Sequence, residues 1–268
     1  MKIIDAHIHL HNDPYFDRIA LAAGHENTLE HLKKTFERYN IAHAIVMGNN
    51  VLGSDELSYP DYVSYCVGLD SIWCHAADKS YLQIEKHLQR PNCVGIKLYP
   101  GYISCYVSDP IYQPIYELAK QYKKPVAIHT GATAASNALL KYSHPLTVDE
   151  VAVQWPDVNF IMCHIGNPWL VDAAAVMDKN PNVAADLSGL LEGLVHMPDF
   201  LARNRLYLEQ LKTWLSYLDD YERLMYGTDW PLANIGNYID FIKEIIPERH
   251  WEKVFFHNAN RIYKLNVR

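Results

Sequence analysis

The sequence predicts an α/β fold, a (β/α)8 TIM barrel formed by residues 1–268 as a single domain. Short apolar runs alternate with longer segments of helical spacing along the whole chain, as expected for parallel strands joined by crossover helices. Eight such runs occur in 268 residues, which is the number of strands in this barrel. Several runs end in His, Lys or Asp, and the catalytic residues of such barrels come from the carboxyl ends of several strands.

The predicted strands differ in how they end. The first is interrupted by His7 and His9, and the fourth carries Lys97 near its end. The fifth, sixth and eighth share one pattern, in which an apolar run is followed by one residue that can bind a metal and then by a strand breaker. The seventh ends with Asp186 shortly before Ser188 and Gly189. In order, the strands are expected at 3–10, 42–47, 65–69, 93–98, 126–130, 159–164, 183–187 and 224–228.

Segments of helical spacing lie between these strands. They predict helices at 28–39, 80–88, 111–122, 147–155, 169–178 and 200–217. A doubly wound open sheet is the structural alternative. No Gly-x-Gly-x-x-Gly follows the first strand, which weakens that alternative without removing it.

Composition limits the classes of function. The hydrophobic fraction is 49%, and a domain of this size buries roughly three quarters of its unfolded surface, so it needs no disulfide or structural metal. A metal would therefore be functional. The net charge is -7 without a cluster of Lys or Arg, which argues against nucleic acid and membrane partners and favours a small-molecule substrate.

The cysteines and the N-terminus indicate a reducing compartment. Five cysteines without Cys-x-x-Cys spacing are expected to be reduced core thiols. The first strand begins within three residues of Met1, and its histidines interrupt what would have to be the apolar part of a signal peptide. No apolar run approaches the ~18 residues of a spanning helix. We therefore expect a cytoplasmic protein.

The pair His7 and His9 is the most informative motif. Successive side chains of a strand point to opposite faces, so residues two apart point the same way. Two neutral imidazoles on one face can bind one divalent ion. With His129 and Asp229 they form a set of nitrogen and oxygen ligands that leaves one position open for water. Zinc is the expected ion, and manganese or ferrous iron would accept a similar set.

This ligand set predicts hydrolysis. A bound metal lowers the pKa of water from 15.7 toward ~7 and polarises a carbonyl. The predicted reaction is the attack of this activated water on an amide, ester or lactone carbonyl of a small molecule.

The motifs together resemble the amidohydrolase superfamily, and most closely its amidohydrolase-2 branch. His7-x-His9, His129, His164 and the segment Gly227-Thr228-Asp229-Trp230-Pro231 carry the resemblance. It extends over the chain, because the segments at 95–100, 186–189 and 258–263 also match the branch. It implies a slightly distorted TIM barrel of the metallo-dependent hydrolase type.

The resemblance also implies roles for single residues. One metal would be held by the first-strand pair, His129 and Asp229. His164 would orient water or polarise the substrate, and Asp229 would also move a proton. In binuclear relatives a fourth-strand lysine is carbamylated and bridges two metals, so Lys97 leaves the metal count open. We expect one metal, with Lys97 as a substrate contact.

Several alternatives stay open at this stage. The branch includes metal-dependent enzymes that decarboxylate aromatic or unsaturated acids without oxidation. Tyr99 and Tyr102 would contact a substrate or, equally, a second subunit of a homodimer. Lys97 would otherwise reach solvent past a buried stem. For Asp186 we expect either a helix cap or a hydrogen bond to a ligand histidine.

A metal-containing binding or scaffold protein without catalysis is the third hypothesis. It is disfavoured, because a structural site needs neither an open coordination position nor a supporting His164.

Overall fold

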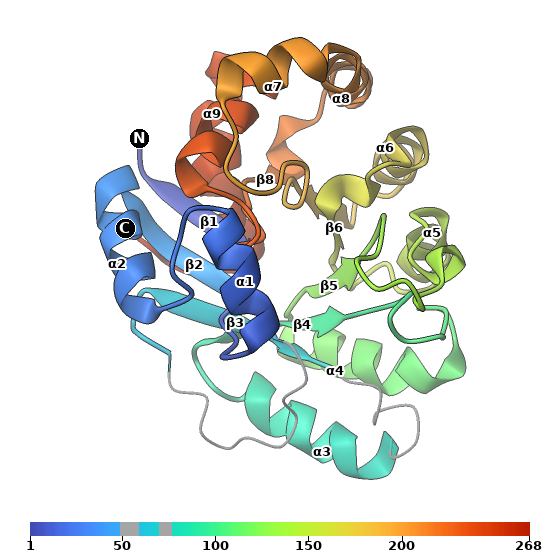
Figure 1. Ribbon diagram of the computed structural model, residues 1–268. Helices are drawn as coiled ribbons and strands as arrows, with labels where there is room; N and C mark the ends of the chain where they lie inside the picture. Colours follow the sequence, from blue (N-terminus) through green and yellow to red (C-terminus); the bar gives the residue numbers. More distant parts are fainter. Residues whose placement is uncertain (49–58, 70–76) are drawn as a thin grey trace.

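A single sheet of parallel strands forms the centre of the molecule. The structure is a computed structural model and describes residues 1–48, 59–69 and 77–268. Over these residues eight strands pair in sequence order, and the helices surround them (Figure 1). The strands are β1 (Ile3–Ile8), β2 (Ile41–Met47), β3 (Val63–Gly68), β4 (Cys93–Leu98), β5 (Val126–His129), β6 (Phe160–Cys163), β7 (Val183–Asp186) and β8 (Leu224–Met225). The predicted fold is confirmed: this is a slightly distorted (β/α)8 barrel.

The barrel closes irregularly between β8 and β1. Only two residues of β8 are regular, whereas the sequence predicted a strand over 224–228. Beyond Met225 the two segments are joined by backbone hydrogen bonds from Ala6 to Tyr226 and from Asp229 to His7. Asp229 itself has a left-handed φ of 61°, so the chain turns at this residue.

The helices confirm the predicted alternation with some changes. They are α1 (Pro14–Ala22), α2 (Leu29–Tyr39), α3 (Ala77–Leu88), α4 (Gln113–Tyr122), α5 (Leu146–Gln154), α6 (Leu170–Lys179), α7 (Met197–Arg203), α8 (Arg205–Leu218), α9 (Ile235–Ile245) and α10 (Asn258–Ile262). The helix predicted at 200–217 is two helices, because Asn204 leaves the helical conformation with ψ of 20°. The predicted set lacks α1, α9 and α10. Helix α1 is capped by Asp13 and begins with Pro14, and both residue types also favour turns.

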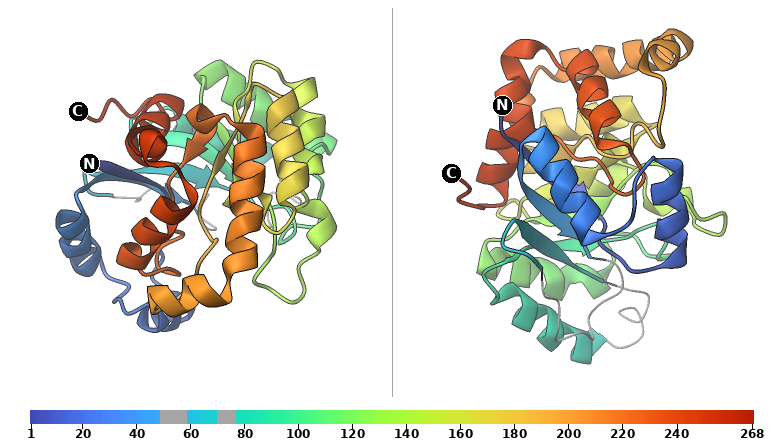
Figure 2. Two further views of the ribbon diagram at one scale, coloured as in Figure 1. Left: turned by 90° about the horizontal axis from the view of Figure 1, so that it is seen from above. Right: turned by 60° about the vertical axis from the view of Figure 1, so that its left-hand side comes forward.

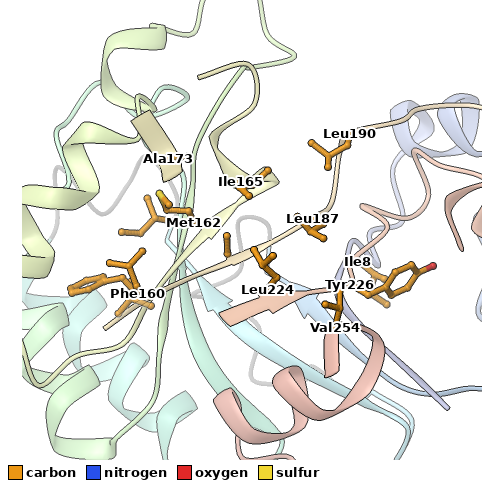
Figure 3. Packing of buried hydrophobic residues seen from close by; sticks show 14 of the residues in the cluster. Ile8, Phe160, Met162, Ile165, Ala173, Leu187, Leu190, Leu224, Tyr226 and Val254 are labelled. Carbon is orange, nitrogen blue, oxygen red and sulfur yellow. The ribbon is translucent and has the colours of Figure 1, made fainter. Parts of the chain in front are cut away.

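Two apolar clusters fill the two faces of the sheet. Alternate strand residues such as Phe160 and Met162 pack against the surrounding helices, as Figure 3 shows for β6 and its neighbours. The residues between them, such as Ile161, face into the barrel. There they meet Ala259 and Tyr263 at the C-terminal end of the chain, where both termini lie on one side (Figure 2). This apolar floor leaves the opposite end of the barrel for the site.

The described cysteines differ in burial. Cys66, Cys93 and Cys163 are buried and form no disulfide with another described residue, and Cys105 is half-buried. Cys74 lies outside the described residues. Among the helices that the structure describes, none combines the length and the apolar character needed to cross a membrane.

Asp5 ties the closing strands together. Its carboxyl group accepts hydrogen bonds from the backbone N–H of Thr228 at 2.9 Å and from its hydroxyl at 2.6 Å. Burial raises the pKa of Asp5 to about 7, and the hydrogen bonds from Thr228 oppose this shift. Asp5 thus holds the segment that carries Asp229 against the strand that carries His7.

We expect Thr228→Val to lower the free energy of unfolding by about 1–3 kcal/mol, because it leaves a buried carboxyl oxygen without its hydroxyl donor. Urea denaturation measures the change. Thr213→Val is the control, because Thr213 is exposed and its hydroxyl bonds only to the Glu209 carbonyl of its own helix. Equal stability of the Thr228 variant and the wild type would contradict this role of Asp5.

Candidate metal centre

The residues predicted for the site meet at the carboxyl ends of the strands. His7 lies near the end of β1, His129 closes β5, His164 follows β6, and Asp229 lies beyond β8. They line one cavity of about 540 Å³. A pocket of this volume is of the size that holds a small-molecule ligand. The other predicted residues that line the same cavity are His9, Lys97, Tyr99 and Tyr102.

Three side chains converge on one point of this cavity. Nε2 of His9 lies 3.0 Å from Oδ1 of Asp229, and Nε2 of His7 lies 3.4 Å from the same oxygen. The Nδ1 atoms of both rings form hydrogen bonds elsewhere. Nδ1 of His9 lies 3.2 Å from the Met47 carbonyl oxygen, and Nδ1 of His7 lies 2.9 Å from Oδ2 of Asp186. These contacts orient both Nε2 atoms toward Asp229.

The convergence leaves polar atoms that a cation would satisfy. Nε2 of His7 and Oδ1 of Asp229 are buried and have no hydrogen-bond partner among the described residues. Buried polar atoms without partners are costly. The ligand atoms of His7, His9 and Asp229 all lie within 4.8 Å of one another. Two imidazoles and a carboxylate form a donor set that suits a divalent metal, so the residues present fit the predicted ion.

The pKa shifts in this group agree with metal ligation. Burial lowers the pKa of His7 to about 4, which keeps its imidazole neutral as a ligand must be. Burial acts to raise the pKa of Asp229, but the nearby imidazoles of His7, His164 and His9 outweigh it and hold this pKa well below its ordinary value. Asp229 is therefore a carboxylate at neutral pH.

His129 lies beside this group but does not join it. Its Nε2 lies 3.1 Å from the carbonyl oxygen of Ala132. The ring centre is 5.0 Å from that of His164 and 5.0 Å from that of Tyr102. The predicted role of His129 as a metal ligand stays a prediction.

Two residues of the site have a backbone conformation that residues other than glycine rarely adopt. His164 and Asp229 both have φ of 61°, and such left-handed residues persist where the surrounding structure holds them. The N–H of His164 donates to Oδ1 of Asp186 at 3.0 Å. Gly189, with φ of 64°, lies against both side chains, since a Cβ there would be 2.7 Å from Nδ1 of His164 and 3.3 Å from Oδ2 of Asp229.

Lys97 is buried at the floor of the cavity. Its side chain has no solvent exposure, so the alternative in which it reaches solvent is wrong. Nζ lies 2.7 Å from Sγ of Cys163 and 5.0 Å from the ring centre of Tyr99. No carboxylate of the described residues lies within ion-pair distance of Nζ. A buried ammonium without an anion is costly, which is consistent with a predicted contact to substrate.

Tyr99 and Tyr102 form part of the cavity wall. The Tyr99 hydroxyl donates to the Met47 carbonyl oxygen at 3.3 Å, and the Tyr102 hydroxyl accepts from the N–H of Ala134 at 2.9 Å. Their position suits a substrate contact. A homodimer interface at these residues stays a prediction.

Sequence reasoning missed two contributors to the site. Phe16 of α1 lines the cavity, and its ring centre is 5.7 Å from that of His9, but the predicted helices do not include α1. Ser188 contacts both His7 and His164, and the sequence analysis predicts no role for it in the site. The expected hydrogen bond from a ligand histidine to Asp186 is confirmed at 2.9 Å.

The fold and the converging side chains define a class: barrel proteins with a candidate metal centre at the carboxyl ends of the strands. Within this class, the chain belongs to the amidohydrolase family. The family model Amidohydro_2, described as Amidohydrolase, matches residues 4–265. The resemblance seen in the sequence is thereby confirmed.

Similarity to single proteins is more distant. Protein fluG of Emericella nidulans is 28% identical over 166 residues, which are 54% of this chain and 18% of that protein. An uncharacterised TIM-barrel protein from Bordetella bronchiseptica superposes with a TM-score of 0.74 at 20% identity, covering 100% of both chains.

Two further structures have the same fold with different names. A probable 2-pyrone-4,6-dicarboxylic acid hydrolase from Acinetobacter baumannii gives a TM-score of 0.63 at 14% identity, covering 98% of this chain and 100% of that one. A 5-carboxyvanillate decarboxylase from Novosphingobium aromaticivorans, complexed with manganese, gives 0.67 at 11% identity, covering 98% and 96%. These similarities establish the fold, and the two names describe different reactions.

Proposed function

We propose that the protein is a metal-dependent hydrolase of a small molecule with an amide, ester or lactone carbonyl. The convergence of His7, His9 and Asp229, with two buried atoms left without partners, is the observation that carries this proposal. We propose one divalent ion per chain, with His129 as the further ligand. Zinc is our first choice, and manganese, present in the decarboxylase complex, is the second.

When bound, the metal would supply a Lewis acid and a water of lowered pKa. The chain's own residues then perform the proton transfers. The Asp229 carboxylate turns Oδ1 toward the histidines and Oδ2 toward His164, whose Nδ1 is 4.0 Å away. Asp229 thus accepts the proton of the attacking water, and His164 orients that water. Lys97, Tyr99 and Tyr102 position the substrate.

Decarboxylation of an aromatic or unsaturated acid is the second candidate function. The buried ammonium of Lys97 and the aromatic wall of the cavity favour it, because they suit a planar anion. Under either function we propose that residues 1–268 act as one domain in the cytoplasm, as a monomer or a homodimer.

We expect hydrolysis to be seen with lactones, esters or amides when the zinc-loaded or manganese-loaded protein is assayed in ¹⁸O-labelled water. One label would enter the product acid, and no carbon dioxide would form. Aromatic and unsaturated acids are tested in parallel for release of carbon dioxide. Carbon dioxide without label in the product would establish the decarboxylase instead. A metal-loaded protein inert toward both substrate sets would favour the binding protein.

A further inference from the structure

We propose that Ser188 is a positioning residue that connects Asp186 to His164 and fixes the proton of His164 on Nδ1. This inference rests on the proposed function only in assigning His164 a role in the reaction of the substrate. We call the hydrogen-bonded chain from Asp186 through Ser188 to His164 the relay. It follows from hydrogen-bond geometry, and it predicts which ring nitrogen of His164 is free to accept a hydrogen bond.

The Ser188 hydroxyl lies at the centre of a buried polar network. Its Oγ is 2.5 Å from Oδ1 of Asp186, 2.8 Å from Nδ1 of His164 and 3.1 Å from Nδ1 of His7. The serine is fully buried, so water does not compete for these contacts. The network joins β1, β6 and β7, because its members lie on or directly after these strands.

Asp186 can only accept in this network. Oδ1 faces the backbone N–H groups of His164 at 3.0 Å and Ser188 at 3.2 Å, and both groups are obligatory donors. Oδ2 faces Nδ1 of His7 at 2.9 Å. Asp186 therefore accepts the hydrogen bond that the Ser188 hydroxyl donates. This bond is short, as is typical of a hydroxyl that donates to a carboxylate.

The proton of His164 follows from this assignment. A serine hydroxyl has one proton and two lone pairs. Since the proton points to Asp186, Oγ must accept from Nδ1 of His164, and Nδ1 carries hydrogen. Nε2 of His164 then carries the lone pair. His164 lines the cavity, so this nitrogen can accept a hydrogen bond from water or substrate.

The Asp186 carboxylate thereby fixes the tautomers of two imidazoles. Asp186 binds the Nδ1–H of His7 directly, which leaves Nε2 of His7 as a metal ligand. It binds the Nδ1–H of His164 through Ser188, which leaves Nε2 of His164 as a hydrogen-bond acceptor. Partners of this kind are known to fix the tautomer and orientation of site histidines.

The test compares Ser188→Ala with Ser64→Ala. Ser64 is a matched control, because it is also a buried serine, and its Oγ lies 2.9 Å from Nε2 of His43 away from the cavity. Imidazole ¹⁵N chemical shifts, measured with and without zinc, report the tautomer of His164. We expect hydrogen on Nδ1 in the wild type and in the control, and loss of this preference in Ser188→Ala. With a substrate in hand, kcat of Ser188→Ala should fall about 10- to 100-fold, with KM nearly unchanged.

Hydrogen on Nε2 of His164 in the wild type would overturn the proposal, and this result needs no variant to fold. An unchanged tautomer in Ser188→Ala would overturn it as well. The spectra are informative even if no substrate is found, so failure of the relay and failure of the proposed function are separate outcomes. If the enzyme is active but the tautomer of His164 does not depend on Ser188, only the relay is contradicted.

Discussion

His9→Ala is expected to lose the metal and at least roughly a thousandfold of kcat/KM. The metal would contribute several kcal/mol of transition-state stabilisation, and each 1.36 kcal/mol is tenfold in rate. His9 presents Nε2 to Asp229 at 3.0 Å while Nδ1 is held by the Met47 carbonyl. Removing the imidazole takes away one of the three converging donors and leaves His7, Asp229 and the proposed ligand His129, so the affinity for the ion should fall steeply.

Elemental analysis of protein purified without chelator measures this loss as metal per chain. His11→Ala is the matched control, because His11 lines the same cavity but is not in the converging group. It should keep about one metal per chain. Full occupancy in His9→Ala would contradict the assigned ligation. The same measurement on His129→Ala decides whether this histidine is the further ligand.

Much of the fold could be predicted because each strand is a separate apolar run. The limits lie where tertiary contacts override local pattern. The last strand is shorter than predicted, because only Leu224 and Met225 pair with β7. Helix α1 begins with Asp13 as its N-cap and Pro14 as its first residue, and both residue types also favour turns. The break between α7 and α8 depends on the conformation of Asn204 alone.

The candidate site shows the same division. His7 and His9 could be paired from the sequence, because side-chain alternation in a strand puts them on one face. The role of Ser188 could not, because it contacts His164 and His7, which are 24 and 181 residues away in sequence. Only the pairing of β6 with β7 and the closure of the barrel bring these three together. The orientation of His129 toward Ala132 likewise depends on a loop without a sequence signature.

Lys97→Met is expected to separate substrate binding from metal binding. The substitution keeps the apolar stem and removes the ammonium. Its Nζ contacts Sγ of Cys163 and faces the ring of Tyr99, and neither is an anion that balances the charge. If a substrate carboxylate supplies that balance, breaking this buried pair costs about 3–5 kcal/mol, which is roughly two hundred- to five thousandfold in kcat/KM. Neutral lactones or esters should be affected far less.

The metal content and the stability of Lys97→Met are then decisive. About one metal per chain should remain, and the free energy of unfolding of the substrate-free protein should rise, since an isolated buried ammonium is removed. Lys141→Met is the control, because Lys141 is exposed and lies over the Tyr142 ring outside the cavity. Two metals in the wild type, with one lost in Lys97→Met, would instead make Lys97 a bridging ligand. In that case its burial would serve the metal centre, and the preference for an acidic substrate would lose its support.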